Sequence, residues 1–174
     1  MEFKLRTISK SAIPEAVSKV MLYRNLNEPE ESESICHDIL AVDPENQTAL
    51  RLLGLSITDQ FTGHATDRDA EVERIFEKLT DPFERLYCSG LLYERRAKAQ
   101  LRTGRPAQSL LPWFEKAMKC FEDAEKIAPA GNDDAILRWN RCARILKDLP
   151  VEEEEEAFEA HDASPVPDRR NRLK

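Results

Sequence analysis

The feature of this sequence that most constrains its fold is the regular interruption of helix-like stretches by proline and glycine. Between the interruptions, apolar residues recur at intervals of three and four, and this spacing is typical of one face of an α-helix. The third stretch illustrates the pattern with Leu50, Leu53, Ile57 and Phe61. Only 5 glycines occur in 174 residues, and Leu, Ala, Glu, Arg and Lys dominate. The sequence therefore favours helices over strands.

The interruptions divide the chain into seven expected helices. They cover residues 11–26, 28–42, 43–61, 72–79, 81–103, 109–127 and 133–149. Ser11 is expected to cap the first helix, and Asn27 with Glu30 resembles a capping box for the second. Pro44 is expected at the first position of the third helix, where a proline loses no hydrogen bond. Asp81 is expected to cap the fifth helix in the same way as Asn27 caps the second.

Length and charge indicate one domain with an appendage at each end. We expect an N-terminal extension over 1–10, a helical domain over 11–149 and a flexible tail over 150–174. The tail holds eight acidic and four basic residues, so it carries −4 of the net charge of −7. It has a block of glutamates at 152–156 and no apolar periodicity, and such a composition predicts disorder.

The cysteines and the hydropathy indicate a cytoplasmic protein. Cys36, Cys88, Cys120 and Cys142 form no C-x-x-C pair and lie within apolar helical patterns, so we expect buried, reduced thiols. The first ten residues lack the apolar core of an export signal. No stretch approaches the roughly 20 apolar residues of a membrane span, so no membrane association is expected.

Residues with catalytic or metal-binding signatures are absent from the sequence. It contains no glycine-rich phosphate loop, no G-x-S-x-G and no H-E-x-x-H. Cys36 and His37 are adjacent, but neighbouring residues point apart on a helix and make a poor metal site. We therefore expect no enzyme activity, no cofactor and no metal.

Two helices share one spacing of small, apolar and proline residues. Ala117, Phe121, Ala124 and Pro129 are separated by four, three and five positions, and so are Ser32, Cys36, Ile39 and Pro44. This spacing resembles the second-helix signature of the tetratricopeptide-repeat family, whose repeat is about 34 residues long. Tyr23 and Ile57 are 34 residues apart.

Glycines strengthen the resemblance in the first helix of two hairpins. Gly54 follows Leu50 and Leu53, and Gly90 precedes Tyr93 by three positions, as in the family's first-helix pattern with a small residue where two helices touch. In the middle hairpin, a signature that begins at Ala70 would place Arg74 at the aromatic position.

The resemblance implies an all-α fold, a right-handed superhelix of about three antiparallel hairpins closed by a final helix. One hairpin cannot bury its apolar face alone, so neighbours stack and share a core. The final helix is expected to turn a polar face to solvent. Its basic residues suit that role: Arg138, Arg141, Arg144 and Lys147.

In the resembled family the first helix of each hairpin lines a concave groove that holds a peptide. The resemblance therefore implies an adapter module that binds a segment of another protein. By phase, the groove positions here are Arg24, Asn25, Arg51, Leu55, Tyr87, Glu94, Arg95, Lys98, Asn140 and Arg144, with Met21 and Asp59 beside them. The family's carboxylate clamp of Lys and Asn is only partly matched. Arginines suit an acidic or carboxylate-bearing segment, although the same residues also fit a solvated surface with internal ion pairs.

Two other functions remain open at the level of sequence. The protein could be structural, forming a homodimer through its terminal hairpins without a peptide ligand. It could also bind RNA through the basic stripe of Arg95, Lys98, Arg102 and Arg105, but the lack of base-stacking aromatics makes a nucleic-acid partner the less favoured reading. The acidic tail could fold back on this stripe, or it could serve only to keep the protein soluble.

Overall fold

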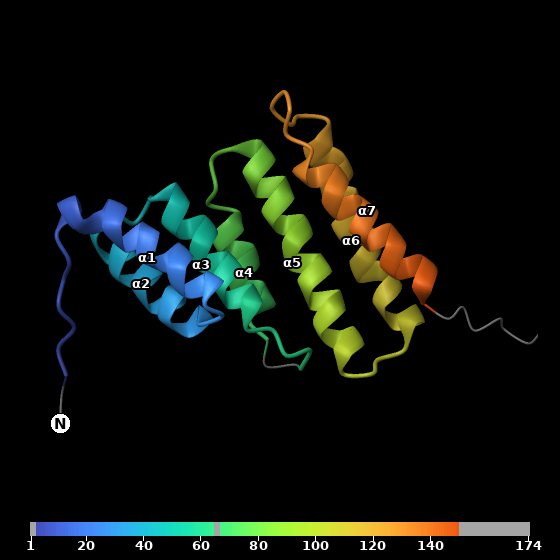
Figure 1. Cartoon of the computed structure of the whole chain (residues 1–174), viewed down its shortest axis with the longest axis horizontal. Helices are drawn as coiled ribbons and strands as arrows, with labels where there is room; N and C mark the ends of the chain where they lie inside the picture. Colours follow the sequence, from blue (N-terminus) through green and yellow to red (C-terminus); the bar gives the residue numbers. More distant parts are fainter. Residues whose placement is uncertain (1–2, 65–66, 150–174) are drawn as a thin grey trace, which may run out of the picture.

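Helices form throughout the part of the chain that the computed structural model describes, residues 3–64 and 67–149 (Figure 1). A short 3-10 helix, Lys10–Ala12, leads into the first α-helix. The α-helices are α1 (Ile13–Asn25), α2 (Pro29–Val42), α3 (Gln47–Asp59), α4 (Asp69–Phe76), α5 (Pro82–Arg102), α6 (Ala107–Glu125) and α7 (Asp134–Asp148). No strand occurs in the described residues, and the all-α prediction is confirmed.

The start of α5 follows the local chemistry that the sequence indicates, and α1 begins with a proline in its first turn. The Asp81 carboxylate accepts hydrogen bonds from the backbone N–H groups of Phe83 and Glu84, so it caps α5. Pro14 lies in the first turn of α1, where a missing N–H leaves no carbonyl without its partner.

Three other residues do not have the role at a helix start that the sequence predicts. Asn27 does not cap α2: it has a φ of 60°, the left-handed conformation that asparagine tolerates, and it lies in the turn after α1. Pro44 also lies in a turn, because the Asn46 side chain accepts from the N–H of Ala49 and α3 begins at Gln47. Ser11 lies inside the 3-10 helix and makes no capping bond to α1.

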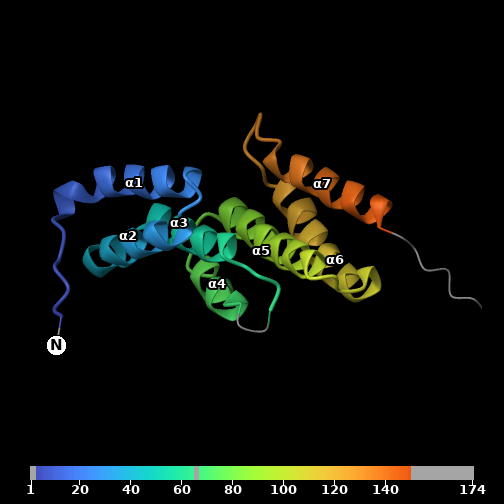
Figure 2. The same ribbon diagram turned by 60° about the horizontal axis from the view of Figure 1, so that its bottom comes forward.

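Consecutive helices pack against each other along the whole described chain, and α3 also contacts α1 and α5. Figure 2 shows α1 and α7 on one side of the molecule, α4 on the other, and α3 and α5 between them. The superhelical stacking of hairpins and its handedness remain predictions from the sequence.

Two glycines allow phenylalanine rings to reach a helix backbone. A Cβ atom at Gly54 would overlap the ring of Phe76, and one at Gly90 would overlap the ring of Phe121. Both rings are almost completely buried. The expectation that a helix contact occurs at these glycines is confirmed.

The buried aromatic residue of the middle hairpin is Phe76. Phe76 is flanked at four and three positions by Val72 and Leu79, which are both buried. Arg74 is exposed, so the residue that a signature starting at Ala70 would place at the aromatic position does not pack in the core.

The buried residues form two apolar clusters that meet at α5. Cys88 and Leu92 of α5 belong to the cluster of α1–α4, whereas Leu91 and Ala97 belong to the cluster of α5–α7. Cys36, Cys88 and Cys142 are buried, and Cys120 is half-buried. Burial raises the pKa of the three buried thiols to about 12, as expected for structural cysteines.

Among the described helices, none combines the length and the apolar character needed to cross a bilayer.

Candidate functional site

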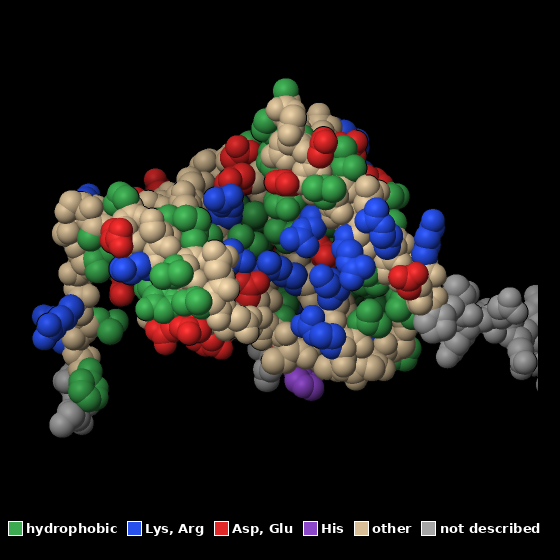
Figure 3. Space-filling model, viewed as in Figure 1, with side chains coloured by type: hydrophobic (Ala, Val, Ile, Leu, Met, Phe, Trp, Pro, Cys, Tyr) green, Lys and Arg blue, Asp and Glu red, His purple; other side chains and the backbone are tan. Residues whose placement is uncertain are grey.

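Basic side chains gather on the face of the molecule that carries α5 and α7 (Figure 3). We call this the basic face and define it by five residues that share ion pairs or a cavity. They are Arg24 of α1, Arg95, Lys98 and Arg102 of α5, and Arg138 of α7. Three helices far apart in the sequence thus contribute to one surface.

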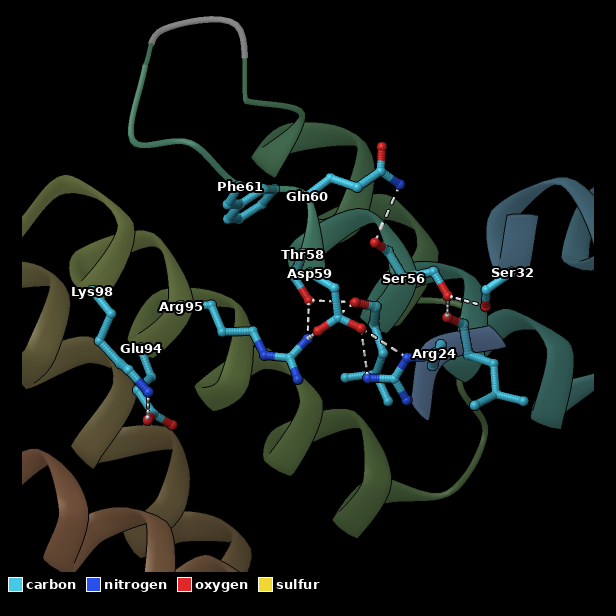
Figure 4. Close-up of polar contacts among 12 residues, drawn as sticks. Arg24, Ser32, Ser56, Thr58, Asp59, Gln60, Phe61, Glu94, Arg95 and Lys98 are labelled. Atoms are coloured by element: carbon cyan, nitrogen blue, oxygen red, sulfur yellow. Dashed lines mark hydrogen bonds and ion pairs between the residues drawn. The ribbon is translucent and has the colours of Figure 1, made fainter. Parts of the chain in front are cut away.

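Asp59, in the last turn of α3, links two of these arginines. Its carboxylate lies 2.8 Å from Nη2 of Arg24 and 2.7 Å from Nη1 of Arg95 (Figure 4). Nε of Arg24 also donates to it at 2.8 Å. One carboxylate therefore joins α1, α3 and α5, and it neutralises only one of the two guanidinium charges.

Arg95 also contacts the end of α3 directly. Its Nη1 donates to the backbone carbonyl of Leu55 at 3.0 Å and to the hydroxyl of Thr58. The C-terminal turn of a helix carries partial negative charge, which a nearby cation stabilises. Burial lowers the pKa of Arg95, whereas the charge of Asp59 opposes that shift. The guanidinium is held in place by α3 before any ligand arrives.

Glu94 forms a second pairing centre beneath the surface. Its side chain is fully buried, and Oε1 lies 3.3 Å from Nζ of Lys98 and 3.6 Å from Nη1 of Arg138. Oε2 has no hydrogen-bond partner in the described structure. Burial lowers the pKa of Arg138, but a hydrogen bond with Tyr87 and the charge of Glu94 together raise it.

These positions correct two expectations. Glu94 does not line the groove surface, because its side chain is buried. Arg138 does not belong to an outward polar face of the final helix, because its guanidinium points to Glu94 of α5. A carboxylate buried at this depth needs cationic partners, and α7 supplies one of them.

A cavity of about 180 Å³ opens on the basic face. Its lining residues are Thr58 and Asp59 of α3 and Arg95, Lys98 and Arg102 of α5. The three cations and one carboxylate leave this cavity with a net charge of +2. The expected stripe on α5 is therefore present at three of its members, while the exposed Arg105 is not part of the lining.

The other expected groove residues do not line this cavity. Arg51 pairs with Glu84 at 3.2 Å, and Tyr87 stacks on Phe83 with ring centroids 5.7 Å apart. Asn25 ends α1 and is exposed, Asn140 is half-buried on α7, and Arg144 is exposed on the same helix. The structure links Arg24, Leu55, Tyr87, Glu94, Arg95 and Lys98 to the basic face by the contacts given above.

Thr58 is the lining residue that sequence reasoning missed. Its hydroxyl donates to the carbonyl of Leu55 at 2.8 Å and accepts from Arg95. A threonine near a helix end is common, and nothing in its neighbours indicates a contact with an arginine 37 residues away.

No group of three or more His, Cys, Asp or Glu side chains could hold a metal ion within the described ranges. Cys36 is buried, while His37 lies 3.5 Å from Glu33 on the surface. The pair therefore diverges, as expected for neighbours on a helix. The acidic tail and its suggested return to α5 lie outside the described residues.

No protein-family model, curated protein or solved structure matches this chain. The similarity to tetratricopeptide repeats remains a prediction drawn from the sequence.

Proposed function

We propose that this protein is a non-catalytic interaction module that holds an acidic segment of another protein on its basic face. The observation that supports this most is the charge balance of that face. Five cationic side chains surround two carboxylates, Asp59 and Glu94, which leaves a net charge of +3. The chain as a whole carries −7. A local excess of positive charge against this background favours a negatively charged partner.

The arrangement also suits binding because the cations are positioned in advance. Arg24 and Arg95 are fixed by Asp59, and Lys98 and Arg138 are fixed by Glu94. Side chains that are already ordered lose less conformational entropy when a ligand arrives. The proposal includes a reducing compartment such as the cytoplasm, where buried thiols stay reduced.

The proposal is tested with the full-length protein and a fluorescent oligoglutamate peptide, read by anisotropy, with an oligoglutamine peptide as the neutral comparison. We expect the oligoglutamate to bind and the oligoglutamine not to bind. Lys98→Gln/Arg102→Gln should weaken binding by about tenfold, since each contact to a charged group contributes roughly 1.5–3 kcal/mol before screening.

The matched control is Lys119→Gln/Lys126→Gln on and just after α6. These two lysines share Asp123 and are well exposed, and neither belongs to the basic face. The control loses the same charge as the test variant. Equal weakening by both pairs would mean that binding follows net charge alone and would refute the site.

Self-association is the second candidate function, and one observation favours it. Met21, Leu22 and Leu26 of the α1 region are 47%, 51% and 56% exposed, and exposed apolar side chains that lie close together often mark an interface. Light scattering across a range of concentrations would reveal a dimer. Leu22→Glu/Leu26→Glu should return such a dimer to monomer, and a monomer at all concentrations excludes this candidate.

A further inference from the structure

The cavity of the basic face has the size of one small anionic group. Its volume is about 180 Å³, enough for several water molecules. A folded segment does not enter such a space, whereas a phosphate group or the charged end of one side chain does. The cavity is therefore a subsite for a single group within a longer ligand.

The charge of the cavity exceeds what one carboxylate neutralises. Arg95, Lys98 and Arg102 against Asp59 leave +2, and Asp59 is shared with Arg24 as well. A partner's glutamate would bring −1. A phosphorylated serine or threonine brings about −1.5 to −2 at neutral pH, which matches the excess.

The donors of the cavity suit a group with several acceptor oxygens. Arg102 is exposed, and its one hydrogen bond in the described structure is a 3.4 Å contact to the carbonyl of Phe61. Lys98 holds one buried oxygen of Glu94 at 3.3 Å and is about a third exposed. Arginine binds phosphate through parallel N–H groups, and lysine does so as a point charge. Positions 95, 98 and 102 lie on one helix face, so these donors point to a common space.

We propose that this cavity binds a phosphate monoester, carried by a phosphorylated serine or threonine within the acidic segment of the partner. This inference rests on the proposed function and makes its ligand more specific. An RNA backbone fits less well, because its diesters carry a single charge each and the lining residues include no aromatic side chain on which a base could stack.

The test compares short peptides in which a central phosphoserine, glutamate or serine is flanked by the same glutamates. Each is titrated into the full-length protein by calorimetry at low and at physiological salt. We expect the phosphoserine peptide to bind about tenfold more tightly than the serine peptide and severalfold more tightly than the glutamate peptide. Its phosphorus NMR signal should shift on binding.

The variants separate the subsite from the rest of the basic face. Lys98→Gln/Arg102→Gln should remove the advantage of phosphoserine over glutamate, while Lys119→Gln/Lys126→Gln should retain it. Thermal melting of both variants establishes that they are folded. Lys98 is one of the two cationic partners of the buried Glu94, so the test variant should melt below the parent protein. Arg102→Gln alone leaves that pair intact, so it should keep the melting temperature of the parent and still reduce the advantage of phosphoserine.

Each outcome decides a different point. If glutamate and phosphoserine peptides bind equally, the phosphate subsite is refuted and the proposed function stands. If none of the peptides binds, both fail. A single-stranded RNA that displaces the phosphopeptide at a lower phosphate concentration would assign the cavity to nucleic acid and refute the inference.

Discussion

At the scale of single residues, Gly54 and Gly90 decide how closely the helices approach. Each glycine presents bare backbone to a phenylalanine ring, Phe76 in one hairpin and Phe121 in the next. Because the rings are buried on all sides, they cannot move aside for an added methyl group. The same contact between a helix glycine and a phenylalanine ring therefore occurs twice in the molecule.

Gly90→Ala should therefore destabilise the protein by about 1–3 kcal/mol. Helix propensity alone predicts the opposite sign, a gain of roughly 1 kcal/mol, but the new Cβ would lie 2.5 Å from Cε1 of Phe121. Urea denaturation gives the free energy of unfolding. Ser89→Ala on the same helix is the control and should change it by no more than about 0.5 kcal/mol.

A second substitution tests the cause of that loss. Replacing Phe121 by leucine in the Gly90→Ala protein should show a coupling of at least about 0.5 kcal/mol, since the smaller side chain relieves the overlap. If Gly90→Ala is stabilising, the close contact between α5 and α6 at this point is wrong.

At the scale of elements, a carboxylate within α2 joins the end of α3 to the start of α4. Glu33 of α2 accepts two hydrogen bonds from Arg68, which immediately precedes α4, at 2.8 and 2.6 Å. It also accepts one from Gln60, which immediately follows α3. The Arg68 hydrogen bonds are the main cause that lowers the pKa of Glu33 from 4.5 to about 2; burial opposes them.

This shift predicts how stability depends on pH. A carboxyl group whose pKa is lower in the folded state stabilises the fold above its unfolded-state pKa. The contribution of Glu33 is therefore present at neutral pH and is lost as the pH falls from about 4.5 towards 2. Glu33→Gln should be less stable than the parent at pH 7, and the difference should shrink across that window.

Chemical denaturation at several pH values measures the effect. Glu31→Gln, on the exposed side of the same helix, is the control and should follow the parent curve. A difference between Glu33→Gln and the parent that stays constant down to pH 2 would contradict the role of the ion pair.

The sequence predicts the helices well because their existence depends on local apolar spacing. It fails where neighbours compete for one role: Asn46 caps α3 three residues after Asp43, so Pro44 is left in the turn. In the site, the stripe of Arg95, Lys98 and Arg102 follows from helical spacing. The burial of Glu94 does not, because it depends on α7, whose Arg138 lies 44 positions further along the chain.

At the scale of the whole molecule, α5 belongs to both apolar clusters. Repeat proteins contact only their neighbours and can lose cooperativity when the array is long. Here the shared helix α5 connects the two apolar clusters, so we expect a single unfolding transition.

Leu92→Ala tests this because its cavity lies in the N-terminal cluster, whereas both tryptophans, Trp113 and Trp139, pack against the C-terminal one. We expect a loss of about 2–5 kcal/mol, with tryptophan fluorescence and far-ultraviolet circular dichroism shifting together. Leu137→Ala, at a side chain that is 64% exposed, should leave both curves almost unchanged. Separated transitions in Leu92→Ala would mean that the halves unfold independently.

The position of Asp59 has a consequence for which anions the protein admits. Because it is part of the chain, the Asp59 carboxylate stays beside Arg24 and Arg95 at an effective concentration in the millimolar range or more. Small monovalent anions therefore meet arginines that already share one carboxylate. A multivalent ligand that engages several cations at once can still displace it. Asp59→Asn would remove this intramolecular competitor, so the surface should then discriminate less between monovalent and multivalent anions.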